Sequence, residues 1–318
     1  MKCLTTKLEK RPASSQIFGD GTDLLVGTYQ LNSNTNSGKN DSSYDGELYL
    51  IGTEDLDINC SLNLNAGIFR FVLDEDGNCV LALTDGRLVI VKFNNQKLYS
   101  AAQFKVCSQM LLDCSILDNQ ILSANTNGRV FLVNVEDGSI LSNFVGHKST
   151  YGLDECEVWC CTWINRQICA TGAEDGILKI WDLRCSSSSG EQQIIKHSAG
   201  VTSLYKLNDY QIMSGSYDDN LRLFDWRNLK EPLSTLKLNG GIWEVTEIEN
   251  NYFILACMYG AKVLQRRFNP VRMLCPSPIA SCPECHNLQS PWVCCLQCYQ
   301  LIKDESEKIK QKMLGNNS

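Results

Sequence analysis

The sequence contains no long run of apolar residues. Its opening stretch, MKCLTTKLEKRPASS, lacks the continuous apolar segment of a secretory signal peptide, and no later run approaches the roughly 18 apolar residues that a membrane helix needs. We therefore expect a soluble, cytoplasmic protein with no membrane partner. Its 17 cysteines are then expected to be reduced thiols, small buried residues or metal ligands rather than disulfides.

Positive charge is also scarce. The chain has 29 Lys and Arg against 36 Asp and Glu, a net charge of −7, and no basic stripe of the kind that phosphate backbones attract. We therefore expect no nucleic-acid partner. With 318 residues, 43% of them hydrophobic, the chain is long enough to bury one large core.

An internal repeat is the main feature that the sequence does have. A small turn followed by an alternating apolar pattern occurs six times, as in TDGRLVIV, AEDGILKIWD and SYDDNLRLFD. The turn residues, 40 to 48 positions apart, are Asp45, Asp85, Asn127, Asp175, Asp218 and Tyr259. This period is typical of four-stranded propeller blades. We predict an all-β, WD40-type β-propeller with six recognisable blades over residues 1–268, a seventh blade missing or replaced, and a Cys-rich, partly disordered tail over 269–318.

Two histidines fit the structural network of WD-repeat blades, in which a histidine joins a turn carboxylate to a strand hydroxyl. The two predicted sets are His147 with Thr171, Asp175 and Trp181, and His197 with Ser214, Asp218 and Phe224. This interpretation gives both histidines a role in stability.

More specific strings point to one family. They include LLVGTYQL at 24–31, GSYDDNLRLFDWRNLKEPL at 215–233, GGIWEV at 240–245 and ACMYG at 256–260. In this order, over roughly residues 17–265, they resemble the WD-repeat diphthine methyltransferase family. The resemblance implies a diphthine methylesterase, a carboxylic ester hydrolase of diphthamide biosynthesis. Its substrate would be the methyl ester of methylated diphthine on translation elongation factor 2. A non-enzymatic WD-repeat scaffold or adaptor is the alternative, because fold alone does not determine function.

The usual serine-hydrolase elbow, G-x-S-x-G, is missing, so no standard triad can be assigned. Only three histidines are present. If a histidine is the general base, His197 is the best candidate, with Asp218 as its orienting partner. The same contact is what the structural interpretation predicts.

Carboxylates are the other candidate bases. The strings ECEVWCCTW and GGIWEV are expected to place Glu157, Trp159, Trp243 and Glu244 at equivalent first-strand positions of different blades, near the central channel. A Glu could activate water there, and the two tryptophans could flank a trimethylated ammonium group. Packing of the tryptophans at the starts of their blades is the alternative.

Smaller residues complete the candidate site. Gly240 and Gly241 either let the backbone approach the substrate or simply make a turn. Cys160 and Cys161 lie in an apolar strand, which favours buried thiols over nucleophiles. Catalysis is expected to need no cofactor, and the protein is expected to be a monomer.

The tail carries two C-x-x-C pairs, Cys282 with Cys285 and Cys295 with Cys298. Four thiolates in this arrangement could bind a structural zinc ion tetrahedrally. The alternative is an aberrant terminus that has lost the last blade, which would leave sheet edges unpaired.

Overall fold

The computed structural model describes residues 6–19, 21–32, 44–74, 76–94, 97–149, 156–185, 191–249, 252–265 and 272–273. All regular structure in these ranges is β-strand. Within them, no helix has the length and apolar character needed to cross a membrane.

The strands form six four-stranded antiparallel sheets, which we call blades 1 to 6 in chain order. Blades 1 to 3 contain β1 (Pro12–Phe18), β2 (Asp23–Thr28), β5 (Glu47–Gly52) and β6 (Ile58–Asn63); β7 (Ile68–Leu73), β8 (Cys79–Leu83), β9 (Arg87–Asn94) and β10 (Lys97–Lys105); and β11 (Leu111–Leu117), β12 (Gln120–Asn125), β13 (Arg129–Asn134) and β14 (Ile140–Val145). Blades 4 to 6 contain β15 (Cys160–Asn165), β16 (Ile168–Gly172), β17 (Ile177–Asp182) and β18 (Glu191–Lys196); β19 (Val201–Lys206), β20 (Gln211–Ser216), β21 (Asn220–Asp225) and β22 (Ser234–Lys237); and β23 (Ile242–Glu249), β24 (Tyr252–Cys257), β25 (Gly260–Gln265) and β26 (Arg272–Met273).

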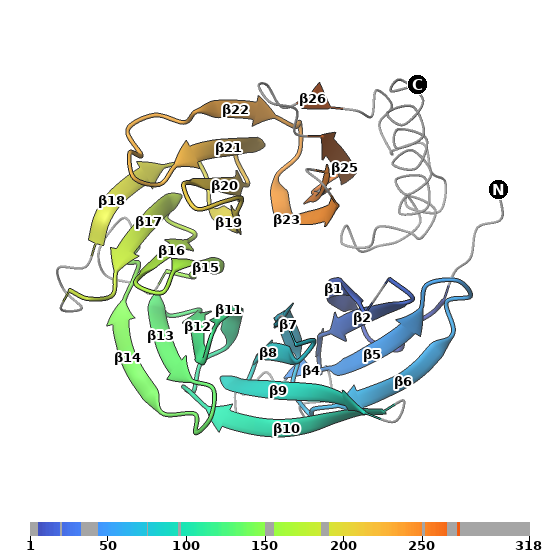
Figure 1. Cartoon of the computed structure of the whole chain (residues 1–318). Helices are drawn as coiled ribbons and strands as arrows, with labels where there is room; N and C mark the ends of the chain where they lie inside the picture. The colour runs from blue at the N-terminus through green and yellow to red at the C-terminus, as the bar shows by residue number, and fades with distance from the viewer. Residues whose placement is uncertain are drawn as a thin grey trace, which may run out of the picture.

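The six blades surround a central axis as an open ring, with blades 1 and 6 at its two ends (Figure 1). The first strand of each blade lies nearest the axis and the fourth lies outermost. The predicted six-bladed propeller is therefore confirmed. Strand β26 lies beyond residue 268, where we expected the propeller to end. The predicted tail beyond this strand lies outside the described residues.

An insertion interrupts blade 1 between β2 and β5. Its ends pair as β3 (Gln30–Leu31) and β4 (Tyr44–Asp45), a two-stranded ladder outside the main sheet. This ladder places Tyr44 beside Tyr29, with the ring centroids 5.7 Å apart. The insertion therefore adds an aromatic side chain near the channel.

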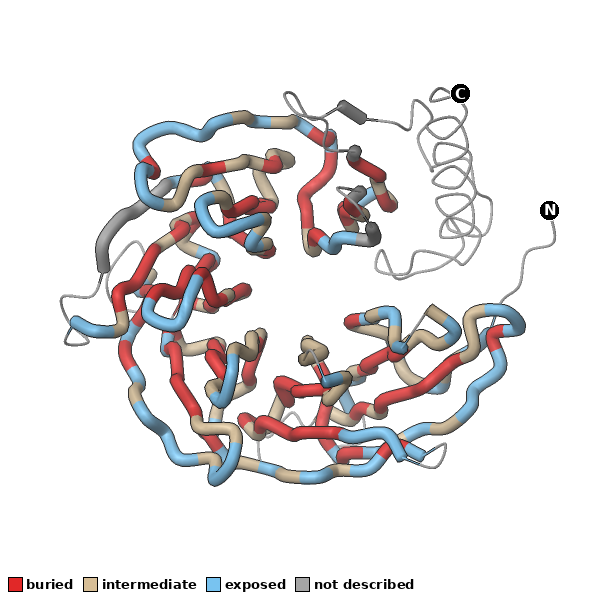
Figure 2. Tube along the Cα trace, viewed as in Figure 1, coloured by how far each residue is buried: buried red, intermediate tan, exposed pale blue. Residues whose placement is uncertain are grey.

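The core lies between neighbouring blades. Figure 2 shows buried positions concentrated on the inner strands, whereas the outermost strands carry many exposed ones. Between blades 2 and 3, for example, Val80 and Leu88 pack in one cluster with Leu111, Ile121 and Phe131. Burial of each such side chain contributes about 1.5–3 kcal/mol. Both faces of these inner strands are covered, since Leu81 packs in the cluster toward blade 1 and Val80 in the cluster toward blade 3, so their apolar residues form continuous runs.

The predicted network of blade 4 is present. The His147 ring lies with Nδ1 2.9 Å from Asp175 Oδ2 and Nε2 2.8 Å from Thr171 Oγ1, and Trp181 Nε1 donates to the same hydroxyl at 2.8 Å. These contacts tie the connection after β14 to blade 4. In blade 5, Phe224 replaces the tryptophan, so that donor is missing from the corresponding set.

A bulge near the start of the first strand recurs around the ring. In β7, β11, β19 and β23 the pairing with the second strand skips one residue, which is Phe69, Leu112, Thr202 or Trp243. A bulge redirects the side chain and the carbonyl group of the extra residue. Three of these residues make contacts across the axis: the carbonyls of Thr202 and Trp243 accept hydrogen bonds from Arg70, and the Phe69 ring contacts Trp159.

Candidate functional site

Arg70 lies at the centre of the channel. It comes from β7 of blade 2, and its guanidinium donates to the carbonyl oxygens of Trp159 at 3.3 Å, Thr202 at 2.9 Å and Trp243 at 2.9 Å. These carbonyls belong to blades 4, 5 and 6. A fourth contact, 3.6 Å from Nη1 to Oδ2 of Asp113, reaches blade 3. One side chain thus connects five blades.

Two carboxylates accompany Arg70. Asp113 accepts hydrogen bonds from the backbone N–H groups of Cys161 at 2.8 Å and Cys114 at 2.9 Å, and its side chain is only 13% exposed. Burial raises the pKa of Asp113 to about 6, despite the opposing effect of Arg70. Burial also raises the pKa of Glu244, and Arg70 again opposes the shift.

Burial alone would lower the pKa of Arg70, but Asp113 and Glu244 raise it, so the guanidinium stays charged. Glu244 differs from Asp113 in one respect: its carboxylate has no hydrogen-bond partner among the described residues. The channel thus holds one fixed cation, one well-bonded carboxylate and one carboxylate able to accept a proton from a further molecule.

Aromatic rings contact one another across the channel. Tyr29 contacts Phe69 with centroids 5.6 Å apart, Phe69 contacts Trp159 at 6.1 Å, Trp159 contacts Trp243 at 6.4 Å, and Trp243 contacts Tyr217 at 4.4 Å. All five residues are half-buried. Because blades 2, 4 and 6 are not neighbours, contacts among Phe69, Trp159 and Trp243 must span the channel rather than a blade interface.

A carboxylate joins this aromatic group. Glu174 follows β16, and its Oε2 accepts a hydrogen bond from Trp159 Nε1 at 2.7 Å. A Cβ on Gly200 would lie 2.7 Å from that oxygen and 3.3 Å from Cδ2 of Tyr217. The absence of a side chain at Gly200 therefore makes room for Glu174 beside Tyr217.

Three of the residues predicted from sequence meet here: Trp159, Trp243 and Glu244. The expected equivalence of Glu157 with them does not hold. Glu157 O accepts from Glu174 N at 2.9 Å, just as Gly241 O accepts from Met258 N at 2.8 Å. Glu157 therefore corresponds to Gly241, two positions before the tryptophan of its blade.

The predicted glycine pair has a packing role in this structure. A Cβ on Gly241 would lie 3.1 Å from Cδ1 of Tyr217, and one on Gly240 would lie 3.3 Å from Cδ2 of Tyr259. Gly241 thus allows Tyr217 to sit close to the start of β23. Their predicted contact with substrate stays a prediction.

His197 and Asp218 belong to the buried network of blade 5. His197 is 2% exposed, with Nε2 2.9 Å from Ser214 Oγ and Nδ1 3.3 Å from Asp218 Oδ2. Burial lowers the pKa of His197, and the hydrogen bond to Asp218 only partly offsets that lowering. Burial raises the pKa of Asp218, but the contact with His197 outweighs it, so the pKa of Asp218 is lowered. These contacts account for both residues structurally, and their catalytic role stays a prediction.

The cysteines in the described ranges are free thiols. Cys160 and Cys161 are buried, and burial raises the pKa of both, which disfavours the reactive thiolate. The predicted zinc ligands Cys282, Cys285, Cys295 and Cys298 lie outside the described residues. Within the described ranges, no group of three or more His, Cys, Asp and Glu is placed to hold a metal ion.

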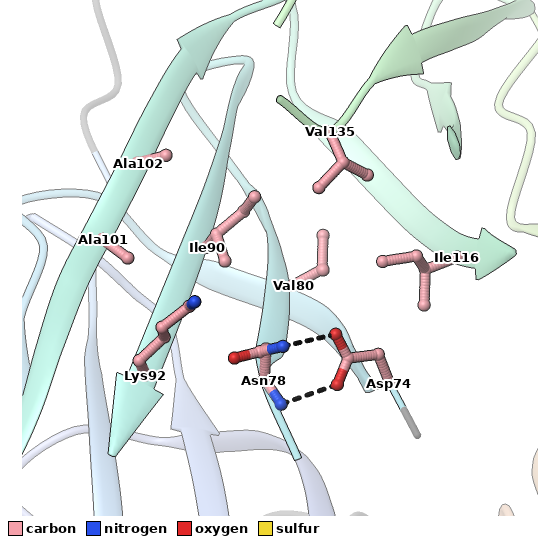
Figure 3. Close-up of a pocket in the computed structure, with 9 residues that line it drawn as sticks. All are labelled: Asp74, Asn78, Val80, Ile90, Lys92, Ala101, Ala102, Ile116 and Val135. Carbon is pink, nitrogen blue, oxygen red and sulfur yellow. Dashed lines mark hydrogen bonds between the residues drawn. The ribbon is translucent and has the colours of Figure 1, made fainter. Parts of the chain in front are cut away.

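A cavity of about 250 Å³ lies between blades 2 and 3 (Figure 3). Its polar edge is formed by Asp74, whose carboxylate accepts two hydrogen bonds from Asn78, both at 2.7 Å. The lining residues are Asp74, Asn78, Val80, Ile90, Lys92, Ala101, Ala102, Ile116 and Val135. None of them belongs to the Arg70 group or to the aromatic chain, so the cavity is separate from the channel site.

Sequence reasoning missed Arg70, Asp113, Phe69, Tyr217 and Glu174. One signal for Phe69 and Arg70 was available in the sequence. The string AGIFRF at 66–71 resembles GGIWEV at 240–245, because in both an aromatic residue and then a charged residue follow the last glycine by two and three positions. Tyr217 and Glu174 have no such local signal. They reach the channel because each follows the second strand of its blade.

Comparison with known proteins agrees with this architecture. The family model "WD domain, G-beta repeat" matches residues 138–182 and 190–225. A Schizosaccharomyces pombe protein named diphthine methyltransferase is 25% identical over 271 residues, covering 79% of this chain and 78% of that protein. The chain is a relative of the diphthine methyltransferases. The human diphthine methyltransferase is 26% identical over 152 residues, covering 46% of this chain and 33% of the human protein.

Among solved structures, a chain of the mitotic checkpoint complex matches with a TM-score of 0.61 at 12% identity, covering 86% of this chain and 84% of that one. At that identity the match concerns the propeller fold alone. The similarity to proteins named diphthine methyltransferase confirms the family resemblance expected from the sequence.

Proposed function

We propose that this diphthine methyltransferase relative is a diphthine methylesterase. Its substrate would be the methyl ester of methylated diphthine on translation elongation factor 2. The similarity to the S. pombe diphthine methyltransferase, over 79% of the chain, carries the assignment to this pathway. The hydrolytic direction is our proposal, and it rests on the carboxylates beside Arg70.

In this reaction Glu244 acts as the general base. Its carboxylate takes a proton from water, the water oxygen bonds to the ester carbon, and the carbon–methoxy bond breaks. The departing methoxide takes up the proton and leaves as methanol, so the products are methanol and diphthine. Water is the only co-substrate that this reaction needs, and we propose no cofactor for it.

Arg70 and the tryptophans have supporting roles. The positive charge of Arg70 would stabilise the negative charge that develops on the ester oxygen, an effect strengthened in a partly water-excluded site. Trp159 and Trp243, whose rings contact each other beside this charged group, would hold the substrate.

The decisive experiment is mass spectrometry of methyl-ester-bearing elongation factor 2 after incubation with the purified protein. We expect the substrate to lose one methylene mass and methanol to appear. Glu244→Gln should leave the ester intact, whereas Glu247→Gln, on the exposed part of the same strand, should not. Glu157→Gln and His197→Ala, run in parallel, test the two other predicted bases.

A second incubation contains S-adenosylmethionine and substrate lacking the ester. A mass gain there would mean that the protein transfers methyl groups, as the names of its relatives say, and would overturn the hydrolytic proposal. No change in either incubation, with a protein shown to be folded, would favour the non-enzymatic adaptor.

A further inference from the structure

Four side chains at the channel are connected by mutual contacts, and we call them the rim cluster: Trp159, Glu174, Tyr217 and Trp243. Trp159 donates to Glu174, Glu174 lies beside Tyr217 over Gly200, Tyr217 contacts Trp243, and Trp243 contacts Trp159. Trp159 and Glu174 come from the ends of strands in blade 4, and Tyr217 comes from the end of a strand in blade 5. Trp243 lies within a strand of blade 6.

Three aromatic rings of the rim cluster pack edge to face. The planes of Trp159 and Tyr217 are each at 89° to that of Trp243, with centroids 6.4 and 4.4 Å away. All three residues are half-buried, in contrast to the core tryptophans Trp163 and Trp181, which are 5% exposed. Aromatic surface is therefore left accessible at the channel rather than consumed in the core.

The charge around these rings is negative. Glu174 is exposed, and its carboxylate raises the pKa of Tyr217, although burial is the larger cause. Asp113 and Glu244 lie near Arg70, their counter-ion, which is bonded to the backbone of Trp159 and Trp243. With Asp113 and Glu244 ionised, three carboxylates face one guanidinium, so the end of the channel attracts cations.

Aromatic faces combined with a nearby carboxylate are the chemistry that recognises alkylated ammonium ions. Such a cation has no N–H group to satisfy, and it gains from cation–π attraction and from burial of its methyl groups. A primary ammonium would instead need several acceptors, whereas one oxygen of Glu174 is already bonded to Trp159.

We propose that the rim cluster binds a quaternary ammonium group, with Trp159, Tyr217 and Trp243 around the methyl groups and Glu174 as the counter-charge. This inference deepens the proposed function and rests on it for the biological ligand, because methylated diphthine carries a trimethylammonium group. The binding itself can be tested without any ester chemistry.

The test is titration of the purified protein with choline and with its neutral isostere 3,3-dimethylbutan-1-ol, followed by tryptophan fluorescence and calorimetry. We expect saturable binding of choline, weakening with added salt, and at least fivefold weaker binding of the isostere, about the selectivity that a cation–π contact gives. Equal binding of the two compounds would reduce the rim cluster to an apolar surface and overturn the proposal.

Two mild variants and one control make the test specific. Glu174→Gln should weaken choline binding about fivefold, as expected for loss of a partly exposed counter-charge. Gly200→Ala should have a similar effect, since its Cβ must displace the Glu174 carboxylate, the far end of a flexible side chain. Glu247→Gln, which lies outside the rim cluster, should bind choline like the wild type. Unchanged affinity in Glu174→Gln would refute the assignment of the counter-charge.

The two proposals can fail separately. Choline binding without ester hydrolysis would leave the rim cluster as an ammonium site and remove the esterase. Ester hydrolysis that choline does not inhibit, in a protein that shows no choline binding, would leave the esterase and remove the ammonium site.

Discussion

Replacement of Arg70 by methionine should destabilise the protein severely. Methionine keeps much of the apolar stem but removes the donors to Trp159, Thr202 and Trp243. It also leaves the 13% exposed carboxylate of Asp113 without its cation. Loss of one partner from a buried ion pair costs about 3–5 kcal/mol, and this is a large fraction of the 5–15 kcal/mol of a typical domain.

The assay is urea unfolding followed by circular dichroism, with stability read from the midpoint at an unchanged slope. The matched control is Arg166→Met. Arg166 also pairs with an aspartate, at 2.6 Å from Asp118, but its side chain is 80% exposed. Such surface pairs contribute about 0–1 kcal/mol, so the control should lose little.

A double variant tests the reasoning further. Arg70→Met combined with Asp113→Leu removes both charges, so it should be less destabilised than the sum of the two single variants. An Arg70→Met variant that loses less than about 1 kcal/mol would refute the view that this side chain connects the blades. Strict additivity of the two changes would refute the coupling with Asp113.

Three further predictions concern single side chains. Glu244→Gln should abolish ester hydrolysis, because the amide cannot accept the proton of water. In the wild type the carboxylate of Glu244 is the active form, so a pH–rate profile should show activity rising with pH through a Glu244 pKa above the usual 4.5. The pKa of Asp113 rises from 3.8 to about 6 on folding. Its contribution to the free energy of unfolding is therefore full below pH 3.8 and is lost as the pH rises through about 6. Urea unfolding at several pH values should show this decline in the wild type and not in Asp113→Asn. Trp181→Phe removes the 2.8 Å hydrogen bond to Thr171 and should lower the free energy of unfolding by about 1 kcal/mol. Thermal unfolding should show a lower midpoint, and an unchanged midpoint would contradict a stabilising role for the His147 network.

The propeller was predictable because its signals are local. Asp85, Asn127, Asp175 and Asp218 each lie just before the third strand of a blade, where the turn residue and the alternating pattern occur together in the sequence. The His147 network was predictable for the same reason, since its members recur at fixed positions within one repeat. Neither prediction required knowledge of which blades face one another.

The channel site was only partly predictable because it depends on which blades face one another across the axis. Arg70 lies 89 residues before Trp159 and 173 before Trp243, and no repeat pattern relates a side chain to carbonyls at those separations. A charged residue in an alternating strand is normally assigned to the surface. Here it is 15% exposed and turned toward the axis.

The two glutamates lie at different distances from the tryptophan of their blades. Glu157 comes two positions before Trp159, whereas Glu244 comes one position after Trp243. Backbone pairing accordingly matches Glu157 with Gly241. Aligning the two strings on their tryptophans shows this offset in the sequence itself.

The bulge at Trp243 in β23 serves both stability and recognition. At Trp243 the bulge lets the carbonyl accept a hydrogen bond from Arg70 while the ring contacts Trp159 and Tyr217. Trp159 is bonded to Arg70 in the same way. The hydrogen bonds that connect the blades therefore also hold the backbone of both tryptophans, so their rings are placed before any ligand arrives. Such preorganisation lowers the entropic cost of binding, and it explains why a candidate site assembled from separate blades can keep one geometry.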